Sequence, residues 1–192
     1  MQSYKQKHSF DYLLGFHCTP ALAGIKCANL LSVCHKTYDN IEQELDKLNR
    51  HFNAKSIFLK RLCLCQSRTL ILVYGKELLE RTIFQKENLA LLQQEGYPIE
   101  KGLDCILEHL SFRLQSAHEF PHEIGIFLGY PLDDVLGFLK HQGRNYKISG
   151  YWKVYGDVCS AKMLFEKYTR CRNNVCNRID MGMSLNQIFK TA

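Results

Sequence analysis

The segment that most constrains the fold is SIFLKRLCLCQSRTLILVYGK, residues 56–76. Its β-branched and aliphatic residues flank a polar turn at Gln66, Ser67 and Arg68. Two such runs on either side of a short polar turn predict a β-hairpin. The segments before and after it have helical periodicity, so the fold must combine a small antiparallel sheet with helices.

Apolar residues recur at helical spacing through most of the remaining chain. Thr19 is a good N-cap and Pro20 suits a first helical turn, so we predict a first helix from Thr19 to Cys34 or His35. Residues 146–156 have the alternation of an extended segment, with Trp152 and Val154 on one face. We predict further helices at residues 39–52, 77–97, 100–115, 121–128 and 131–141, a long last helix capped by Asp157, and a short helix after Gly182.

These elements predict an α+β fold, a mainly helical single domain over residues 1–192 with a small antiparallel sheet. The chain has 192 residues, of which 46% are apolar, which is enough for a hydrophobic core without disulfide or metal staples. No internal repeat, low-complexity tract or linker in the sequence marks a domain boundary.

The cysteines and the N-terminus indicate a cytoplasmic protein. Nine cysteines, an odd number at irregular spacing, do not describe a disulfide framework, so we expect most to be reduced. The first residues contain no apolar run of signal-peptide length, and no window approaches the roughly 18 apolar residues of a membrane helix. The formal charge of +6 permits binding of an anionic ligand, although a solvated basic face is the simpler explanation.

The motif HCTPALAGIK, residues 17–26, contains a candidate nucleophile. A helix that begins at Thr19 would place Cys18 beside unpaired amide groups and the positive end of the helix dipole, which favour a thiolate. His17 and Lys26 would add positive charge near the sulfur. The competing interpretation is that Cys18 is a buried core thiol before an ordinary helix start.

A second candidate is the pair His122 and Glu123 at a predicted helix start. A histidine beside a carboxylate can transfer protons in acid–base catalysis or help to coordinate a metal. Both residue types are also common at helix N-termini without any such function. No second histidine follows at the metalloprotease spacing, and Cys63 with Cys65 lacks the partners of a zinc site. The metal and the cofactor therefore stay unknown. Phosphate-binding glycine loops, dinucleotide fingerprints and nucleophile elbows are missing from the sequence.

Residues 121–156 also fit a helix-turn-helix followed by a wing, which would make the protein a regulator or adaptor that binds DNA or a protein partner. The recognition helix would begin with Leu132, Asp133 and Asp134. Acidic residues at that position repel phosphate. Nucleic-acid binding is therefore disfavoured. Binding of a protein partner through the same helix is the remaining version of this alternative.

Three motifs, HCTPALAGIK, FPHEIGIFLGYPLDDVLGF and GYWKVYGD, together resemble a family from anaerobic Firmicutes known as domain of unknown function 3793. The resemblance covers nearly the whole chain. It implies the fold of that family and an iron-responsive or redox physiology, but no activity. Polar members of such motifs often converge on a site. The resemblance therefore favours one pocket built from Cys18, Lys26, His122, Glu123, Lys153 and Tyr155.

The leading hypothesis is a cytosolic protein that binds a small anionic, metal-containing or redox-active ligand in one pocket. Cys18 would act as the thiolate and Lys26 would supply charge. His122 and Glu123 would transfer protons or orient the ligand. Whether the protein is an enzyme stays open, and covalent thiol chemistry is the expected reaction if it is one. The expected ligand-binding residues are His17, Lys26, Lys153 and Tyr155.

Overall fold

The computed structural model describes residues 9–34, 36–38, 40–64, 68–116 and 120–190. The helices are α2 (Phe10–Leu22), α3 (Ile41–Phe52), α4 (Lys76–Ile83), α5 (Lys86–Gln94), α6 (Gly102–Ser116), α7 (Ile124–Phe127), α8 (Leu132–His141), α9 (Val158–Asp180) and α10 (Leu185–Ile188). Two 3₁₀ turns are η1 (Asn53–Lys55) and η2 (Ile99–Lys101). The strands are β1 (Ala28–Cys34), β2 (Ile57–Leu64), β3 (Arg68–Gly75), β4 (Ile148–Ser149) and β5 (Lys153–Val154).

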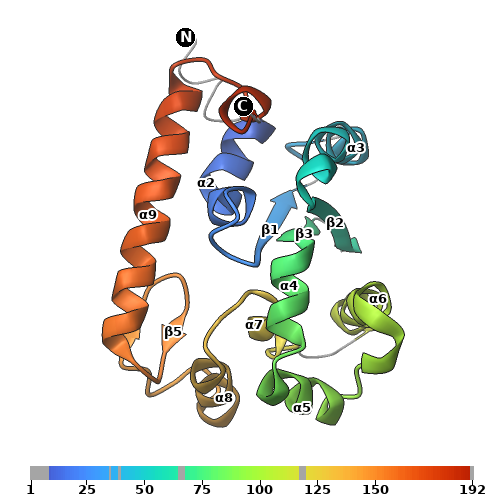
Figure 1. Ribbon diagram of the computed structural model, residues 1–192, viewed down its shortest axis with the longest axis vertical. Helices are drawn as coiled ribbons and strands as arrows, with labels where there is room; N and C mark the ends of the chain where they lie inside the picture. Colours follow the sequence, from blue (N-terminus) through green and yellow to red (C-terminus); the bar gives the residue numbers. More distant parts are fainter. Residues whose placement is uncertain (1–8, 35, 39, 65–67, 117–119, 191–192) are drawn as a thin grey trace.

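Helices form most of the molecule and surround a small antiparallel sheet, which confirms the predicted mainly helical α+β class (Figure 1). The long helix α9 runs along one side with α2 beside it. α3 and α6 lie at the other side of the view, and α5 and α8 lie at the lower end. Within the described part of the chain, no helix is both long enough and apolar enough to cross a membrane.

β3 is the central strand of the main sheet and pairs antiparallel with β1 on one edge and β2 on the other. Its side chains alternate between two apolar clusters, with Leu72 and Tyr74 in one and Ile71 and Val73 in the other. β2 and β3 form the hairpin that segment 56–76 predicts, and two predicted turn residues, Gln66 and Ser67, lie outside the described residues.

Helices bury both faces of this sheet. One cluster joins it to α4, α5, α6 and α7, and includes Leu79 and Phe127 at 0% exposure. The other joins it to α2, α3, α9 and α10, and includes Leu14 and Phe52. A third, smaller cluster around Trp152 packs the β4–β5 hairpin against α9. The three clusters leave hollows where they meet, and these hollows are the pockets described below.

The first predicted helix is wrong in position and extent. The chain forms α2 up to Leu22, turns, and continues as β1 rather than as helix. Gly24, at φ +67°, donates its amide to Ala21 O, and Ile25 donates to Pro20 O. These two bonds close the C-terminal end of a helix. Pro20 therefore lies in the last turn of a helix and not in the first.

The other helices mostly follow their predictions. α3 buries its whole predicted apolar stripe, and Asp157 caps α9 by accepting hydrogen bonds from the amides of Cys159 and Ser160. The segment predicted as one helix over residues 77–97 is divided into α4 and α5. The helix predicted at residues 121–128 is reduced to the single turn α7.

Candidate functional site

Tyr130 lies where three neighbouring pockets meet, and its side chain lines all of them. It follows α7, where Gly129 at φ +66° reverses the chain before α8. The Tyr130 ring stacks on the indole of Trp152, with ring centroids 4.9 Å apart, and its hydroxyl donates to the Tyr151 carbonyl oxygen at 3.4 Å. Tyr130 thus forms a shared wall of the three pockets.

Lys26 lines two of these pockets. Its side chain is 4% exposed, its Nζ donates to Ala28 O at 2.6 Å, and the Nζ lies 5.1 Å from the centroid of the Tyr130 ring. No carboxylate of the described residues pairs with it. Burial lowers the pKa of Lys26 to about 8, and the nearby thiols of Cys27 and Cys18 only partly oppose this shift. A buried lysine without a carboxylate partner is unusual, because desolvation disfavours the ammonium.

The first pocket has a volume of about 400 Å³, and none of its described lining residues is acidic. Arg172 of α9 lines it, with the guanidinium carbon 4.8 Å from the Phe16 ring centroid and 5.9 Å from that of Tyr151. Arg172 Nε is buried without a hydrogen-bond partner among the described residues. We name this the Arg172 pocket. Its lining includes Phe16, His17, Lys26, Asn29, Tyr151 and Arg172.

Two further side chains give the Arg172 pocket hydrogen-bonding capacity. Asn29 accepts a hydrogen bond from the Ala21 amide at 3.1 Å through Oδ1, which leaves its NH₂ group as a donor. Partial burial and the charge of Arg172 lower the pKa of His17, so its imidazole is neutral at pH 7. The pocket therefore combines two cations with an amide donor and a neutral imidazole.

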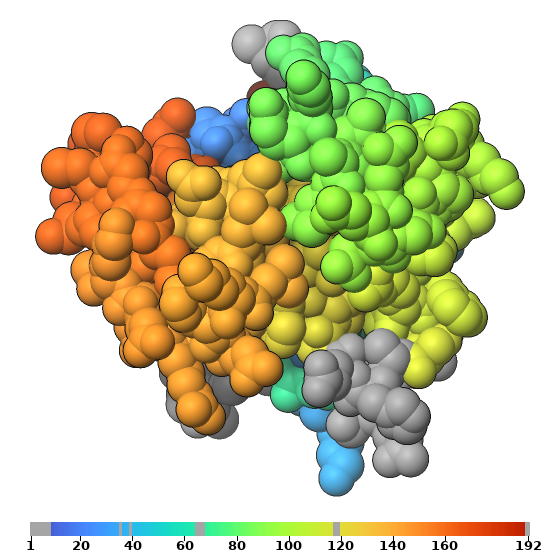
Figure 2. Space-filling model, turned by 90° about the horizontal axis from the view of Figure 1, so that it is seen from below, coloured from blue at the N-terminus to red at the C-terminus, as the bar shows by residue number. Residues whose placement is uncertain are grey.

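The second pocket, of about 540 Å³, shares Lys26 and Tyr130 with the first. Residues of α4, α5, α8 and α9 line it. Figure 2 looks onto the face where the orange surface of α8 meets the green surface of α4 and α5. We name it the Thr82 pocket, and its polar lining residues include Thr82, Asn88 and Asp133. Burial raises the pKa of Cys27, which also lines it, so this thiol stays protonated at neutral pH.

The third pocket, of about 300 Å³, is mainly apolar and lies between α7, α8 and the β4–β5 hairpin. His122 and Lys153 bring polar groups to it. Lys153 Nζ donates to Gly143 O at 2.7 Å and lies 5.0 Å from the Tyr146 ring centroid, so neighbouring groups already engage this cation. We name it the apolar pocket. The rest of its lining includes Phe120, Ile124, Val135, Phe138 and Trp152.

The structural basis predicted for a Cys18 thiolate is wrong. Cys18 lies within α2, towards its C-terminal end, so the positive end of the helix dipole is at the opposite end. The side chain is 0% exposed in the apolar cluster under β1 and β3. Burial raises the pKa of Cys18 to about 12, and the charge of Lys26 offsets this only in part. The thiol is therefore protonated at neutral pH.

Glu123 does not face the same pockets as Lys26. It is 2% exposed, and its Oε1 accepts a hydrogen bond from the Tyr97 hydroxyl at 2.7 Å. Arg113 Nη1 lies 3.2 Å from the same oxygen and 3.0 Å from Glu95 Oε2. Glu123 is thus held in a buried network between α6 and the start of α7.

Four of the remaining predicted site residues divide between two pockets, and Tyr155 lines neither of them. His17 and Lys26 lie together in the Arg172 pocket, whereas His122 and Lys153 lie in the apolar pocket. Tyr155 packs against α8 and its buried hydroxyl has no partner among the described residues. The structure therefore places two of the predicted residues, His17 and Lys26, in the Arg172 pocket but does not gather all of them into one pocket.

Sequence reasoning misses Arg172, Asn29 and Tyr130 as members of the site. No feature of spacing separates Arg172 from its exposed neighbour Arg170. The assignment of residues 28–34 to a helix hides Asn29. This residue lies in β1, where it pairs with Val73 of β3, and its Oδ1 accepts a hydrogen bond from the Ala21 amide of α2. The packing of α9 beside α2 brings Arg172 to the pocket of Lys26.

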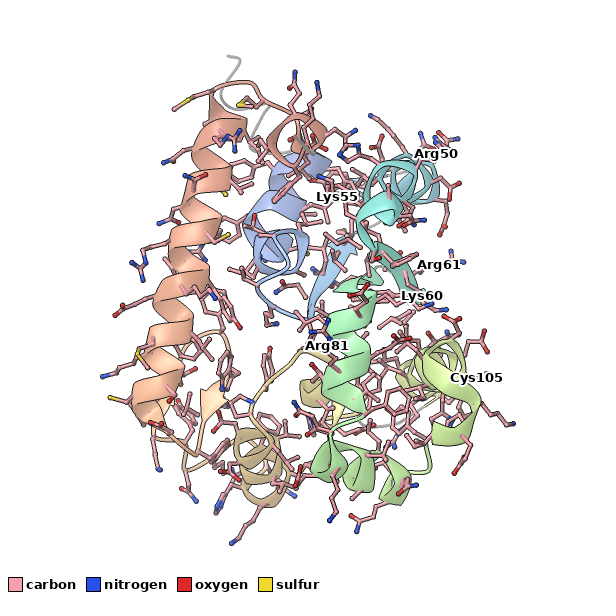
Figure 3. All side chains as sticks on the ribbon, viewed as in Figure 1. Arg50, Lys55, Lys60, Arg61, Arg81 and Cys105 are labelled. Carbon is pink, nitrogen blue, oxygen red and sulfur yellow. The ribbon has the colours of Figure 1, made fainter. Side chains whose placement is uncertain are left out.

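Three other basic side chains, Lys55, Lys76 and Arg81, line a further pocket of about 330 Å³, which also contains Glu77. Arg61 and Arg81 pair with surface carboxylates, at N–O distances of 2.5 and 3.5 Å. Exposed pairs of this kind contribute little to stability. Figure 3 labels basic side chains along α3, η1, β2 and α4: Arg50, Lys55, Lys60, Arg61 and Arg81.

The described residues contain no group of three or more histidine, cysteine or acidic side chains placed to hold a metal ion. The helix-turn-helix interpretation of residues 121–156 rests on α7 and α8. α7 is a single buried turn, and α8 begins with Asp133 exposed and Asp134 buried. Binding of DNA or of a protein by this segment stays a prediction.

The fold and the pockets together define a mainly helical α+β protein with a cationic pocket where α2, β1 and α9 meet. The chain belongs to a family described as Protein of unknown function (DUF3793), whose family model matches residues 14–189. The family resemblance seen in the sequence motifs is thus confirmed. No curated protein and no solved structure matches the chain.

Proposed function

We propose that the protein binds a small organic anion in the Arg172 pocket. The observation that carries this proposal is that two cations, Lys26 and Arg172, line one pocket in which no described residue is acidic. Among the described residues, Lys26 donates one hydrogen bond, to a backbone carbonyl. The Arg172 guanidinium lies against the rings of Phe16 and Tyr151, and its buried Nε has no hydrogen-bond partner there.

Electrostatics explains why an anion suits this pocket. Burying a cation costs free energy unless a counter-charge or several hydrogen bonds compensate it. Lys26 has three N–H donors and Arg172 has five, and the fork of the guanidinium matches the oxygens of a carboxylate or phosphate. A bound anion would satisfy both side chains at once and would offset the desolvation of Lys26.

The volume and the lining favour an organic anion over bare phosphate. About 400 Å³ falls within the range of roughly 300–1,000 Å³ that is typical of small-molecule sites. The rings of Phe16, Tyr130 and Tyr151 offer an apolar wall for a carbon skeleton. The NH₂ group of Asn29 offers a further polar contact. A carboxylate or phosphate ester with a short carbon chain fits this combination.

We also propose a cytoplasmic location. The eight cysteines among the described residues are all free thiols, as is usual for proteins in reducing compartments. A role in iron or redox physiology rests on the family resemblance alone. The burial of Cys18 argues against a ligand held by that sulfur at neutral pH.

Isothermal titration calorimetry with lactate and with inorganic phosphate tests the anion site. Wild-type protein should bind at least the organic anion at low ionic strength. Arg172→Gln should weaken binding by about tenfold or more, because a charge-assisted contact is lost. Arg170→Gln is the matched control, since it removes the same charge from an exposed position on the same helix. Equal weakening in both variants, or no binding to wild type, would contradict the proposal.

A further inference from the structure

The amine of Lys26 is buried between two pockets, a placement that binding of an anion by charge alone does not require. Lys26 lines both the Arg172 pocket and the Thr82 pocket, so ligand atoms in either one would meet its amine. Its only hydrogen bond to a described residue goes to Ala28 O. A lysine kept for structure alone would normally pair with a carboxylate or reach solvent. Lys26 does neither, being 4% exposed.

We propose that Lys26 forms a Schiff base with a small oxo acid held in the Arg172 pocket. This inference rests on the proposed anion site and names its ligand class. Arg172 would hold the carboxylate, because its planar fork suits a bidentate contact. The carbonyl group of the same molecule would then lie beside the Lys26 amine. An oxo acid carries both groups that these side chains would contact: a carboxylate for Arg172 and an electrophilic carbonyl carbon for Lys26.

The protonation state of Lys26 supports nucleophilic attack. Burial lowers the pKa of Lys26 to about 8, so a substantial fraction of the amine is neutral near physiological pH. Lysines activated by desolvation are the ones that form such covalent intermediates. The neighbouring thiols do not compete as nucleophiles, because burial raises the pKa of both Cys18 and Cys27.

The step balances without a further reactant. The Lys26 ammonium gives one proton to a base, and the free amine attacks the carbonyl carbon to form a C–N bond. The carbinolamine oxygen then takes up protons and leaves as water, which yields the iminium. His17 lines the same pocket with a neutral imidazole, so it is the group placed to accept the first proton and to return it.

Reductive trapping tests this inference on the full chain. Wild-type protein is incubated with pyruvate and sodium cyanoborohydride, and peptide mapping locates each modified lysine. Trapping adds the mass of the oxo acid less one oxygen atom. We expect Lys26 to be modified at least about tenfold faster than Lys162, an exposed lysine on α9. A parallel arm with 4-oxopentanoate tests the spacing between carboxylate and carbonyl.

The outcomes separate the two proposals. The Schiff base is supported if Lys26 is labelled faster than Lys162 and excess lactate suppresses this labelling. In Arg172→Gln the rate at Lys26 should then fall to that of Lys162. If calorimetry shows that lactate binds but neither oxo acid labels Lys26 faster than Lys162, the Schiff base is overturned. The anion site is then retained. Labelling of Lys26 that neutral acetone matches in rate overturns the carboxylate anchor. No binding of lactate and no selective labelling overturns both.

Discussion

The indole Nε1 of Trp152 donates a hydrogen bond of 2.6 Å to Oδ2 of Asp134. The other carboxylate oxygen of Asp134 accepts hydrogen bonds from the amides of Tyr155 and Gly156, at 2.6 and 2.7 Å. Asp134 belongs to α8 and is 3% exposed, so one buried carboxylate fixes the β4–β5 hairpin to that helix. Because Trp152 stacks on Tyr130, the same carboxylate also sets the wall between the pockets.

Replacing this carboxylate should loosen the hairpin. Asp134→Asn keeps the side-chain shape but leaves one acceptor oxygen for three donors. We expect the free energy of unfolding to fall by about 2–4 kcal/mol, since a hydrogen bond to a charged group contributes about 1.5–3 kcal/mol. Urea denaturation measures this change. Trp152 is the single tryptophan of the chain, so its fluorescence emission should also shift to the red.

Asp133→Asn is the matched control for this variant. Asp133 is the exposed neighbour of Asp134, and its replacement removes the same charge from the same helix end. Its effect on the free energy of unfolding should stay within about 0.5 kcal/mol. Equal losses in the two variants would show that the buried carboxylate does not hold the hairpin.

The buried charge of Lys26 should lower the free energy of unfolding of the ligand-free protein at neutral pH, relative to an uncharged side chain at this position. The pKa of Lys26 falls from 10.5 to about 8 on folding, so the unfolded chain binds more protons between these two pH values. The free energy of unfolding therefore rises with pH across that window, by about 3 kcal/mol from this residue. Well below pH 8 both states are fully protonated, and the full destabilisation is present there.

Lys26→Met isolates this effect, because methionine fills the volume without a charge. The variant should be more stable than wild type at pH 7, by up to about 3 kcal/mol. The difference should shrink as the pH rises from about 8 to 10.5, and calorimetric binding of lactate should be lost. Urea denaturation of both proteins at several pH values gives the difference directly. A pH-independent difference would mean that Lys26 keeps its ordinary pKa in the folded protein.

Local sequence signals account for much of this fold. The 56–76 hairpin, the stripe of α3 and the Asp157 cap of α9 are each specified by residues close together in the chain. Their patterns therefore predict the correct elements. The alternation in the 146–156 segment is also correct, since Trp152 and Val154 are buried.

The errors arise where local signals conflict or where the site depends on tertiary packing. Thr19 and Pro20 have the chemistry of a helix start, yet the positive φ of Gly24 closes α2 just after them. A short apolar run such as residues 28–34 has no periodicity that separates strand from helix. The meeting of Lys26 with Arg172 depends on where α9 packs, which no spacing in the sequence encodes.

Glu123 should prove to be a structural residue. Glu123→Gln removes the charge that pairs with Arg113 but retains an acceptor for the Tyr97 hydroxyl. We expect the free energy of unfolding to fall by about 1–3 kcal/mol, because the buried network loses its ionic contact. Binding of lactate should be unchanged, since Glu123 does not line the Arg172 pocket.

Glu95→Gln provides the comparison for Glu123, because Glu95 pairs with the same arginine from a more exposed position. Its cost should be less than about 1 kcal/mol, because both side chains of this pair are partly exposed to solvent. Urea denaturation and calorimetry on the two variants measure both quantities. A loss of lactate binding in Glu123→Gln, with folding intact, would restore the functional role that the sequence motif suggests.

Cys18 should be unreactive in the folded protein. Its pKa of about 12 lies well above the ordinary value of 9.0, so at neutral pH its thiolate fraction is smaller by about a thousandfold than that of a free thiol. Cys159 is exposed at the start of α9 and serves as the internal reference. With limiting iodoacetamide, mass mapping should show Cys18 alkylated at least about a hundredfold more slowly than Cys159. In guanidinium chloride the two rates should converge, because the difference comes from burial and not from local sequence.

If Cys18 instead reacts as fast as Cys159 in the folded protein, the sulfur is accessible and ionised. A thiolate site at the end of α2 would then have to replace the amine at Lys26 as the reactive group.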